Sequence, residues 1–146
     1  MAGTAPGLLA ISALVLLSLL HLYWFAGGRW PGADEASLMR MVVGHTPTGR
    51  MPGGWATLGV ALGCLGGAAV LAMRHGLMAS PLPFPLTNGA AWLLAGMFLL
   101  RGAGGYLDHR LRPRIIGTPY ERLNRRVYSP LALALAAAML GALALG

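Results

Sequence analysis

Four apolar stretches of membrane-spanning length divide this chain of 146 residues. A helix needs roughly 20 apolar residues to cross the hydrocarbon core of a bilayer, because it rises about 1.5 Å per residue. Each stretch is close to that length, so the sequence predicts an all-α integral membrane four-helix bundle. The helices are predicted at about 7–26, 54–73, 89–107 and 119–146, and the last is predicted to span the membrane from about residue 129.

Composition favours the same class of protein. Hydrophobic residues make up 56% of the chain and charged residues only 10%, whereas a soluble domain carries about a quarter charged residues. All eleven basic residues are Arg, and together with abundant Ala, Gly and Leu this suggests a GC-rich bacterial gene. The arginines lie in loops beside apolar runs, where anionic lipid head groups are the usual partners. We therefore predict a multi-pass bacterial inner-membrane protein that binds no nucleic acid.

The distribution of arginine predicts the orientation. Ten of the eleven arginines lie in segments 27–53 and 101–128, and only Arg74 lies in the connection between the second and third helices. Loops rich in Arg and Lys remain on the cytoplasmic side of a membrane. Loops 27–53 and 108–118 are therefore predicted to be cytoplasmic, with both termini outside.

Local signals place two helix starts in the predicted cytoplasmic loops. Asp34 can cap a short helix that ends at Gly44, and the apolar residues of this helix suit the membrane interface. Thr118 can cap the fourth helix, with Glu121 completing a capping box. Pro130 then either kinks that helix or separates an interfacial turn from the spanning part.

Small residues at a spacing of four define two candidate packing faces. Lipid supplies no hydrophobic drive between helices, so close helix packing depends on small residues. The two faces could meet inside one chain, or they could join two chains as a homodimer, and the spacing is compatible with both. The residues are Gly59, Gly63 and Gly67 in the second helix, and Ala134, Ala138 and Ala142 in the fourth.

Polar and aromatic residues collect at the predicted cytoplasmic ends of the helices. His21 lies inside the first helix, and a polar residue at that depth normally faces the bundle and finds a partner. One interpretation is an interfacial belt, in which aromatic rings anchor the helices and Arg101 extends to the surface. The other is a pocket for an anionic or polar ligand. Its candidate residues are His21, Trp24, Arg101, Tyr106, Arg125 and Tyr128.

Other chemistry has little support in the sequence. The four histidines and four carboxylates show no metal-site or haem spacing, so we predict no metal and no cofactor. No nucleophile motif surrounds a serine or the single cysteine, Cys64.

Three functions are compatible with these residues. The leading hypothesis is a non-enzymatic membrane protein that binds a lipid head group or docks against a larger membrane complex. One alternative is an enzyme acting on a lipid or isoprenoid-like substrate, with His21 as acid/base and Arg101 or Arg125 holding an anionic group. Another is a small transporter that works as a dimer.

Four motifs support a resemblance to a known family. HLYWFAGGRWP closes the first helix, VVGHTPTGRMP lies in the first loop, FLLRGAGGY closes the third helix and NRRVYSPL opens the fourth. In this order they resemble a family of small four-helix bacterial membrane proteins that is a domain of unknown function. The resemblance implies a four-helix membrane fold over essentially the whole chain and implies no activity. Asn124 stands where the resemblance implies an acidic residue. The implied motif positions are His21, Tyr23, Trp24, Gly27, Gly28, Arg101, Tyr128 and Pro130.

Overall fold

Every regular element in residues 4–145, which the computed structural model describes, is helical. The all-α prediction is therefore confirmed, and residue 146 of the fourth predicted helix lies outside the described residues. The long helices are α1 (Thr4–Phe25), α3 (Gly54–Arg74), α4 (Phe84–Gly105) and α7 (Ser129–Leu145). The short elements are α2 (Glu35–Val42), α5 (Asp108–Leu111), the 3-10 turn η1 (Pro113–Ile115), α6 (Pro119–Leu123) and the π-helical turn η2 (Asn124–Tyr128).

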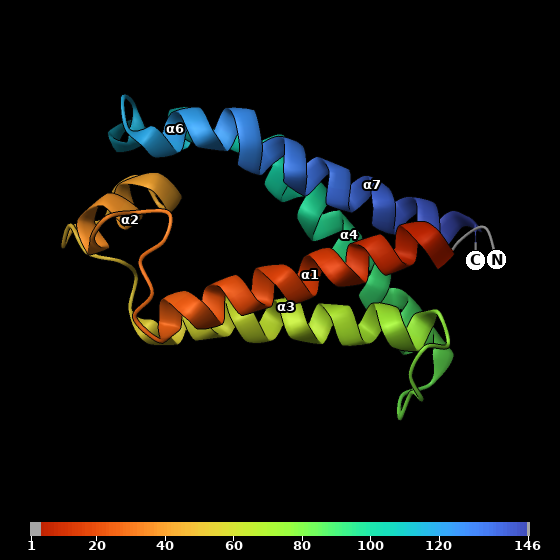
Figure 1. Cartoon of the computed structure of the whole chain (residues 1–146). Helices are drawn as coiled ribbons and strands as arrows, with labels where there is room; N and C mark the ends of the chain where they lie inside the picture. The colour runs from red at the N-terminus through yellow and green to blue at the C-terminus, as the bar shows by residue number, and fades with distance from the viewer. Residues whose placement is uncertain (1–3, 146) are drawn as a thin grey trace.

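The long helices form two antiparallel pairs, α1 with α3 and α4 with α7 (Figure 1). The pairs meet where α1 contacts α7 and α3 contacts α4. Their shared core lies near the first turns of α1 and the last turns of α7, whereas the ribbons of α1 and α7 diverge toward α2 and α6. The core residues are Ala10, Leu14, Ala68, Leu71, Ala91, Ala95, Leu135, Met139 and Leu143.

Within residues 4–145, three helices are long and apolar enough to cross a membrane: Ala5–Phe25, Gly54–Arg74 and the continuous helix Pro119–Leu145. The third of these comprises α6, η2 and α7. α4 is as long as α1 but less apolar, because Asn88, Arg101 and several glycines interrupt its leucines. Many large apolar side chains on these helices are exposed, including Leu9, Leu16, Leu62, Leu93, Leu100 and Leu131.

α4 begins at Phe84, five residues before the predicted start at about residue 89. Pro81, Pro83 and Pro85 give this stretch the composition of a loop. Proline is tolerated in the first turn of a helix, where its missing N–H has no intrahelical partner to lose. Pro85 occupies this turn, and Arg74 Nε donates to Asn88 Oδ1 at 3.0 Å, which ties the turn to the end of α3.

The predicted caps of the two loop helices are present. Asp34 Oδ1 accepts the Ser37 N–H at 2.7 Å and the Asp34 N–H donates to Ser37 Oγ at 3.0 Å, so α2 has a reciprocal capping box. Thr118 Oγ1 accepts the Glu121 N–H at 3.4 Å at the start of α6. The Glu121 carboxylate accepts the Gly117 N–H at 2.8 Å, whereas a capping box would use the N–H of Thr118 itself.

Pro130 neither ends the last helix nor splits it. Proline lacks an N–H, and its ring clashes with the carbonyl four residues earlier in a regular α-helix. The π-helical turn η2 ends at Tyr128, two residues before Pro130, and the Ser129 N–H bonds to the Asn124 carbonyl five residues back. This wider turn accommodates Pro130 and keeps Pro119–Leu145 continuous.

The two predicted small-residue faces do not pack against each other. α3 and α7 share no substantial contact, because each packs on α1 and α4 instead. Gly67 is buried near Leu94, but a Cβ at Gly59 or Gly63 would meet nothing within 4 Å. On α7, Ala134 is exposed, Ala138 is half-buried and Ala142 is buried.

The close approach between α4 and α7 depends on Gly102 instead. Gly102 is buried, and a Cβ there would lie 2.6 Å from Leu133 Cγ and 2.9 Å from the Leu133 backbone nitrogen. The backbone atom cannot move aside without moving α7. A side chain at residue 102 would therefore force the two helices apart.

Gly102→Ala is expected to lower the free energy of unfolding by about 1 to 3 kcal/mol, the usual cost of overpacking a close interface. Denaturant unfolding in mixed micelles, followed by circular dichroism, measures this loss. Gly63→Ala is the matched control and should leave stability unchanged or slightly raised, because alanine is the better helix former. Equal losses in both variants would mean that another chain or lipid packs on Gly63.

His75 offers a pH-dependent contribution to stability. Its Nε2 atom is buried without a hydrogen-bond partner among the described residues, and its ring packs on Gly7 at the start of α1. Burial, followed by the neighbouring Arg74 guanidinium, lowers the pKa of His75. The unfolded chain therefore binds the proton more readily than the folded chain, so stability is present above the ordinary His pKa and is lost as pH falls below it.

Lowering the pH from about 7.5 to about 5.5, across the ordinary pKa of histidine, should lower the thermal unfolding midpoint of the wild-type protein in detergent. His75→Leu should reduce that drop, because the titrating group is gone. Substitution of the exposed His45 by Gln serves as the control and should leave the drop unchanged. A drop of the same size in His75→Leu would assign the pH dependence to other groups.

Candidate functional site

Asn124 forms a buried hydrogen-bond centre between α4 and the last helix. Its side chain is 1% exposed. Asn124 Oδ1 accepts from Arg101 Nη2 at 3.0 Å and from Ser129 Oγ at 3.4 Å, while Nδ2 donates to the Gly105 carbonyl at 2.8 Å. Gly105 lies directly against the Ser129 hydroxyl, where a Cβ would overlap it. The amide therefore satisfies polar groups of two helices at their closest approach.

A second set of hydrogen bonds holds α2 on the last helix. Tyr128 donates its hydroxyl proton to the Met41 carbonyl at 3.1 Å, and Arg112 Nη2 donates to the Val43 carbonyl at 2.8 Å. α2 packs against α6, beside which it lies in Figure 1. The last turn of α2 is thus anchored by side chains that come from elements far along the chain.

Asp108 fixes the arginine that holds α2. Its Oδ2 atom accepts the Tyr120 hydroxyl at 2.8 Å and pairs with Arg112 Nη1 at 3.3 Å. The Arg112 guanidinium also lies over the Tyr120 ring, 5.5 Å from its centroid. A charge-assisted network of this kind is stronger than its neutral counterpart, and it leaves Arg112 oriented toward Val43.

A hollow of about 470 Å³ opens on the surface beside α6 and η2. Three guanidinium groups and one phenol line it, from Arg122, Arg125, Arg126 and Tyr106. Its one carboxylate belongs to Glu121, which accepts the Gly117 N–H. The lining is therefore strongly positive, and we call this site the basic hollow. Its residues are Tyr106, Gly117, Thr118, Glu121, Arg122, Arg125 and Arg126.

His21 and Trp24 form a separate group at the end of α1. His21 Nδ1 donates to the Leu17 carbonyl at 2.8 Å, and its ring meets the edge of Trp24 with centroids 4.9 Å apart. Trp24 Nε1 donates to the Trp30 carbonyl at 2.7 Å. These bonds hold the imidazole and the indole against their own helix and the loop that follows it.

Glycine closes α1 just beyond this group. Gly27 has φ +94°, and the Gly27 and Gly28 N–H groups bond to the Trp24 and Tyr23 carbonyls at 3.0 and 2.9 Å. This is a Schellman motif, which requires a left-handed residue that glycine adopts without strain. The chain therefore turns sharply away from the end of α1.

The structure brings some of the predicted ligand residues together and separates others. Tyr106 and Arg125 both line the basic hollow. Arg101 is bonded to Asn124 and Tyr128 faces α2, so each serves a neighbouring network. Among residues 4–145, His21 and Trp24 form no hydrogen bond with any of these four, and a single pocket of all six does not form.

Asn124 is not among the six ligand residues predicted from the sequence. Its signal was present, because Asn124 precedes an arginine pair in the motif that opens the fourth helix. Its partner on α4 could not be read from that motif. Arg122 and Arg126 were likewise left out of the candidate ligand set. Among the described residues, no group of three His, Cys, Asp or Glu side chains is placed to hold a metal ion.

Comparison with known families adds one match. The family model described as "Protein of unknown function (DUF3995)" matches residues 14–139. The chain belongs to the DUF3995 family. The resemblance inferred from the four motifs is therefore confirmed as membership of a family of unknown function. The matched range runs from within α1 to within α7, so the DUF3995 region includes both the Asn124 network and the basic hollow. No curated protein and no solved structure matches the chain.

Asn124→Ala should lower the free energy of unfolding by about 1 to 3 kcal/mol, because the buried Gly105 carbonyl and Ser129 hydroxyl lose their partner. Asn124→Asp should lie between Ala and wild type, since a carboxylate still accepts from Arg101 but cannot donate to Gly105. Denaturant unfolding in mixed micelles measures both. Arg122→Ala, at an exposed position, is the control. If Asn124→Ala has the same free energy of unfolding as the wild type, water replaces the amide as hydrogen-bond partner and the prediction is wrong.

Proposed function

We propose that this protein is a non-enzymatic, four-span bacterial inner-membrane protein whose basic hollow binds the phosphate of anionic lipids. The basic hollow carries the proposal, because three arginines and a tyrosine converge at one end of the apolar helices. Arginine binds phosphate oxygens through paired N–H groups, and a phenol adds a further donor. The arginine distribution supports an orientation with this end in the cytoplasm and both chain termini outside.

Helix length supports placing the hollow at head-group level. The continuous helix Pro119–Leu145 has 27 residues, which corresponds to about 40 Å at 1.5 Å per residue. The hydrocarbon core is about 30 Å thick. If the apolar α7 fills that core, the first turns of the helix project beyond it. Arg122, Arg125 and Arg126 lie in those turns, where lipid phosphates are found.

Charge balance also favours an external anion. Each of the four Asp and Glu side chains accepts a hydrogen bond from within the fold. Among residues 4–145, Arg112 alone forms an ion pair, with Asp108. None of the three arginines of the basic hollow forms an ion pair in that range, and Glu121 is the one carboxylate in the lining, so the hollow keeps a net positive charge. The four carboxylates and their bonded partners are Asp34 with Ser37, Glu35 with Met51, Asp108 with Tyr120, and Glu121 with Gly117.

The fourth span is α4. Its mid-section offers exposed apolar side chains to lipid, and its one cation, Arg101, lies near the end of the helix. Arg101 donates to Asn124, so part of its hydrogen-bonding capacity is satisfied by protein. A long cationic side chain near a helix end can extend its remaining donors to the interface.

The test compares two triple variants that remove the same charge. In nanodiscs of phosphatidylglycerol and phosphatidylcholine in equal amounts, Arg122→Gln/Arg125→Gln/Arg126→Gln should reduce phosphatidylglycerol affinity at least about tenfold, given about 1 kcal/mol for each cation near a lipid surface. Native mass spectrometry of protein released from the nanodiscs counts the phosphatidylglycerol molecules retained. Added salt should weaken wild-type binding, because it screens exposed charges.

Arg40→Gln/Arg50→Gln/Arg110→Gln is the matched control, because these arginines are exposed and lie outside the basic hollow. This variant should retain phosphatidylglycerol nearly as wild type does. If both triple variants lose the lipid equally, general charge attraction explains the binding and the proposed site is wrong.

A further inference from the structure

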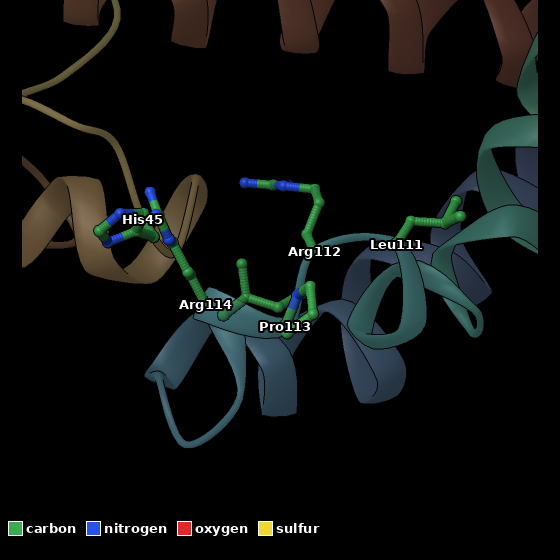
Figure 2. Close-up of a pocket in the computed structure, with 6 residues that line it drawn as sticks. His45, Leu111, Arg112, Pro113 and Arg114 are labelled. Atoms are coloured by element: carbon green, nitrogen blue, oxygen red, sulfur yellow. The ribbon is translucent and has the colours of Figure 1, made fainter.

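A second pocket, of about 280 Å³, lies where the coil after α2 meets the turn between α5 and α6. It shares no lining residue with the basic hollow. Figure 2 shows His45 entering from the α2 side, while Arg112 and Arg114 extend from the opposite segment toward the side on which His45 lies. We call this site the His45 pocket. Its residues are His45, Leu111, Arg112, Pro113, Arg114 and Ile115.

The position of His45 is determined by well-packed neighbours. Gly44 has φ +90°, and a Cβ there would lie 2.9 Å from the Tyr120 ring and 3.0 Å from Ile115. Arg112 Nη2 holds the preceding Val43 carbonyl at 2.8 Å. Because Val43 and Gly44 are both fixed, the imidazole is held next to the 111–115 segment, although about seventy residues separate them in sequence.

The charges of the pocket are unbalanced. Arg112 is paired with Asp108 and bonded to Val43, so it acts mainly in the structure. Arg114 is exposed and, within residues 4–145, has no ion pair or side-chain hydrogen bond. His45 also has no side-chain hydrogen bond within that range. No carboxylate lines the pocket, so its charged side chains are the two arginines.

Part of the lining is apolar. Leu111 and Pro113 are exposed and supply aliphatic surface on the same segment as the arginines, whereas Ile115 is buried. The volume of about 280 Å³ corresponds to several water molecules at roughly 30 Å³ each, which is more than one bare phosphate group needs. The pocket therefore suits an anion that carries a carbon body on one side.

We propose that the His45 pocket binds a phosphate monoester. The Arg114 guanidinium donates paired N–H groups to two phosphate oxygens, and the His45 ring N–H donates to the phosphate as well. The carbon group attached to the ester oxygen lies on Leu111 and Pro113. A soluble phosphate ester and the monoester head group of phosphatidic acid share this chemistry, and the experiment distinguishes the two sources.

The test uses the full chain in phosphatidylcholine nanodiscs. Glycerol 3-phosphate is titrated calorimetrically, and a second set of nanodiscs that also contains phosphatidic acid is analysed for retained lipid by native mass spectrometry. Arg114→Gln should weaken binding about tenfold, the usual effect of losing a charge-assisted pair of hydrogen bonds. His45→Gln should weaken it severalfold, and Arg114→Lys should restore part of the loss because the charge returns without the planar fork.

Arg110→Gln is the matched control, because Arg110 is exposed on the adjacent α5 and does not line the pocket. It should change affinity by less than about twofold, as expected for a surface charge outside the site. The triple variant of the basic hollow should also bind the monoester normally, so the two proposals can fail separately.

Arg114-dependent binding of glycerol 3-phosphate assigns the pocket to a soluble ester. Arg114-dependent retention of phosphatidic acid alone assigns it to the lipid. The proposal is overturned if neither monoester binds, or if Arg110→Gln and Arg114→Gln weaken binding equally. Because Arg114 is exposed and its side chain forms no hydrogen bond or ion pair among the described residues, its substitution should leave the thermal unfolding midpoint unchanged, and that measurement accompanies each titration.

Discussion

The buried amide of Asn124 holds α4 against the last helix at the end of the molecule where the shared core is missing. One oxygen and one nitrogen satisfy a guanidinium, a hydroxyl and a backbone carbonyl from three different turns. This arrangement requires the π-helical turn that Asn124 begins, because that turn positions Ser129 and accommodates Pro130. It also requires glycine at residue 105, against which the Ser129 hydroxyl lies. The hydrogen bonds of Asn124 therefore depend on the local backbone geometry.

The small number of acidic groups determines which arginines are paired. With only four carboxylates against eleven arginines, the fold uses its acids for helix caps, loop bonds and one ion pair. Arg112 therefore holds the end of α2 through the Val43 carbonyl. The arginines of α6 and η2 line the basic hollow, and Arg114 lines the His45 pocket. The same end of the molecule thus combines structural arginines with arginines available to external anions.

Sequence patterns predicted those features that depend on neighbouring residues in the chain, namely helices and their caps. The caps at Asp34 and Thr118 and the helical content follow from short-range rules, and they were read correctly. The start of α4 was misplaced because Pro85 can belong to a loop or to a first helical turn. Helix partners depend on tertiary packing, so glycine spacing on α3 did not reveal that Gly59 and Gly63 face outward. For the same reason, Tyr106 and Arg125 could be proposed as neighbours from topology, whereas the bonds of Tyr128 to Met41 and of Asn124 to Arg101 could not be derived from spacing.

The attachment of α2 has a mechanical consequence. The two helix pairs are joined by a core near one end, so they form two arms that diverge toward the other (Figure 1). α2 is docked on the arm that contains α6, yet the chain connects it on both sides to the arm formed by α1 and α3. Any change in the angle between the arms must therefore be absorbed by segments 26–34 and 45–53, which are rich in glycine and proline. These segments act as tethers, and their extended length sets the greatest separation that the arms can reach.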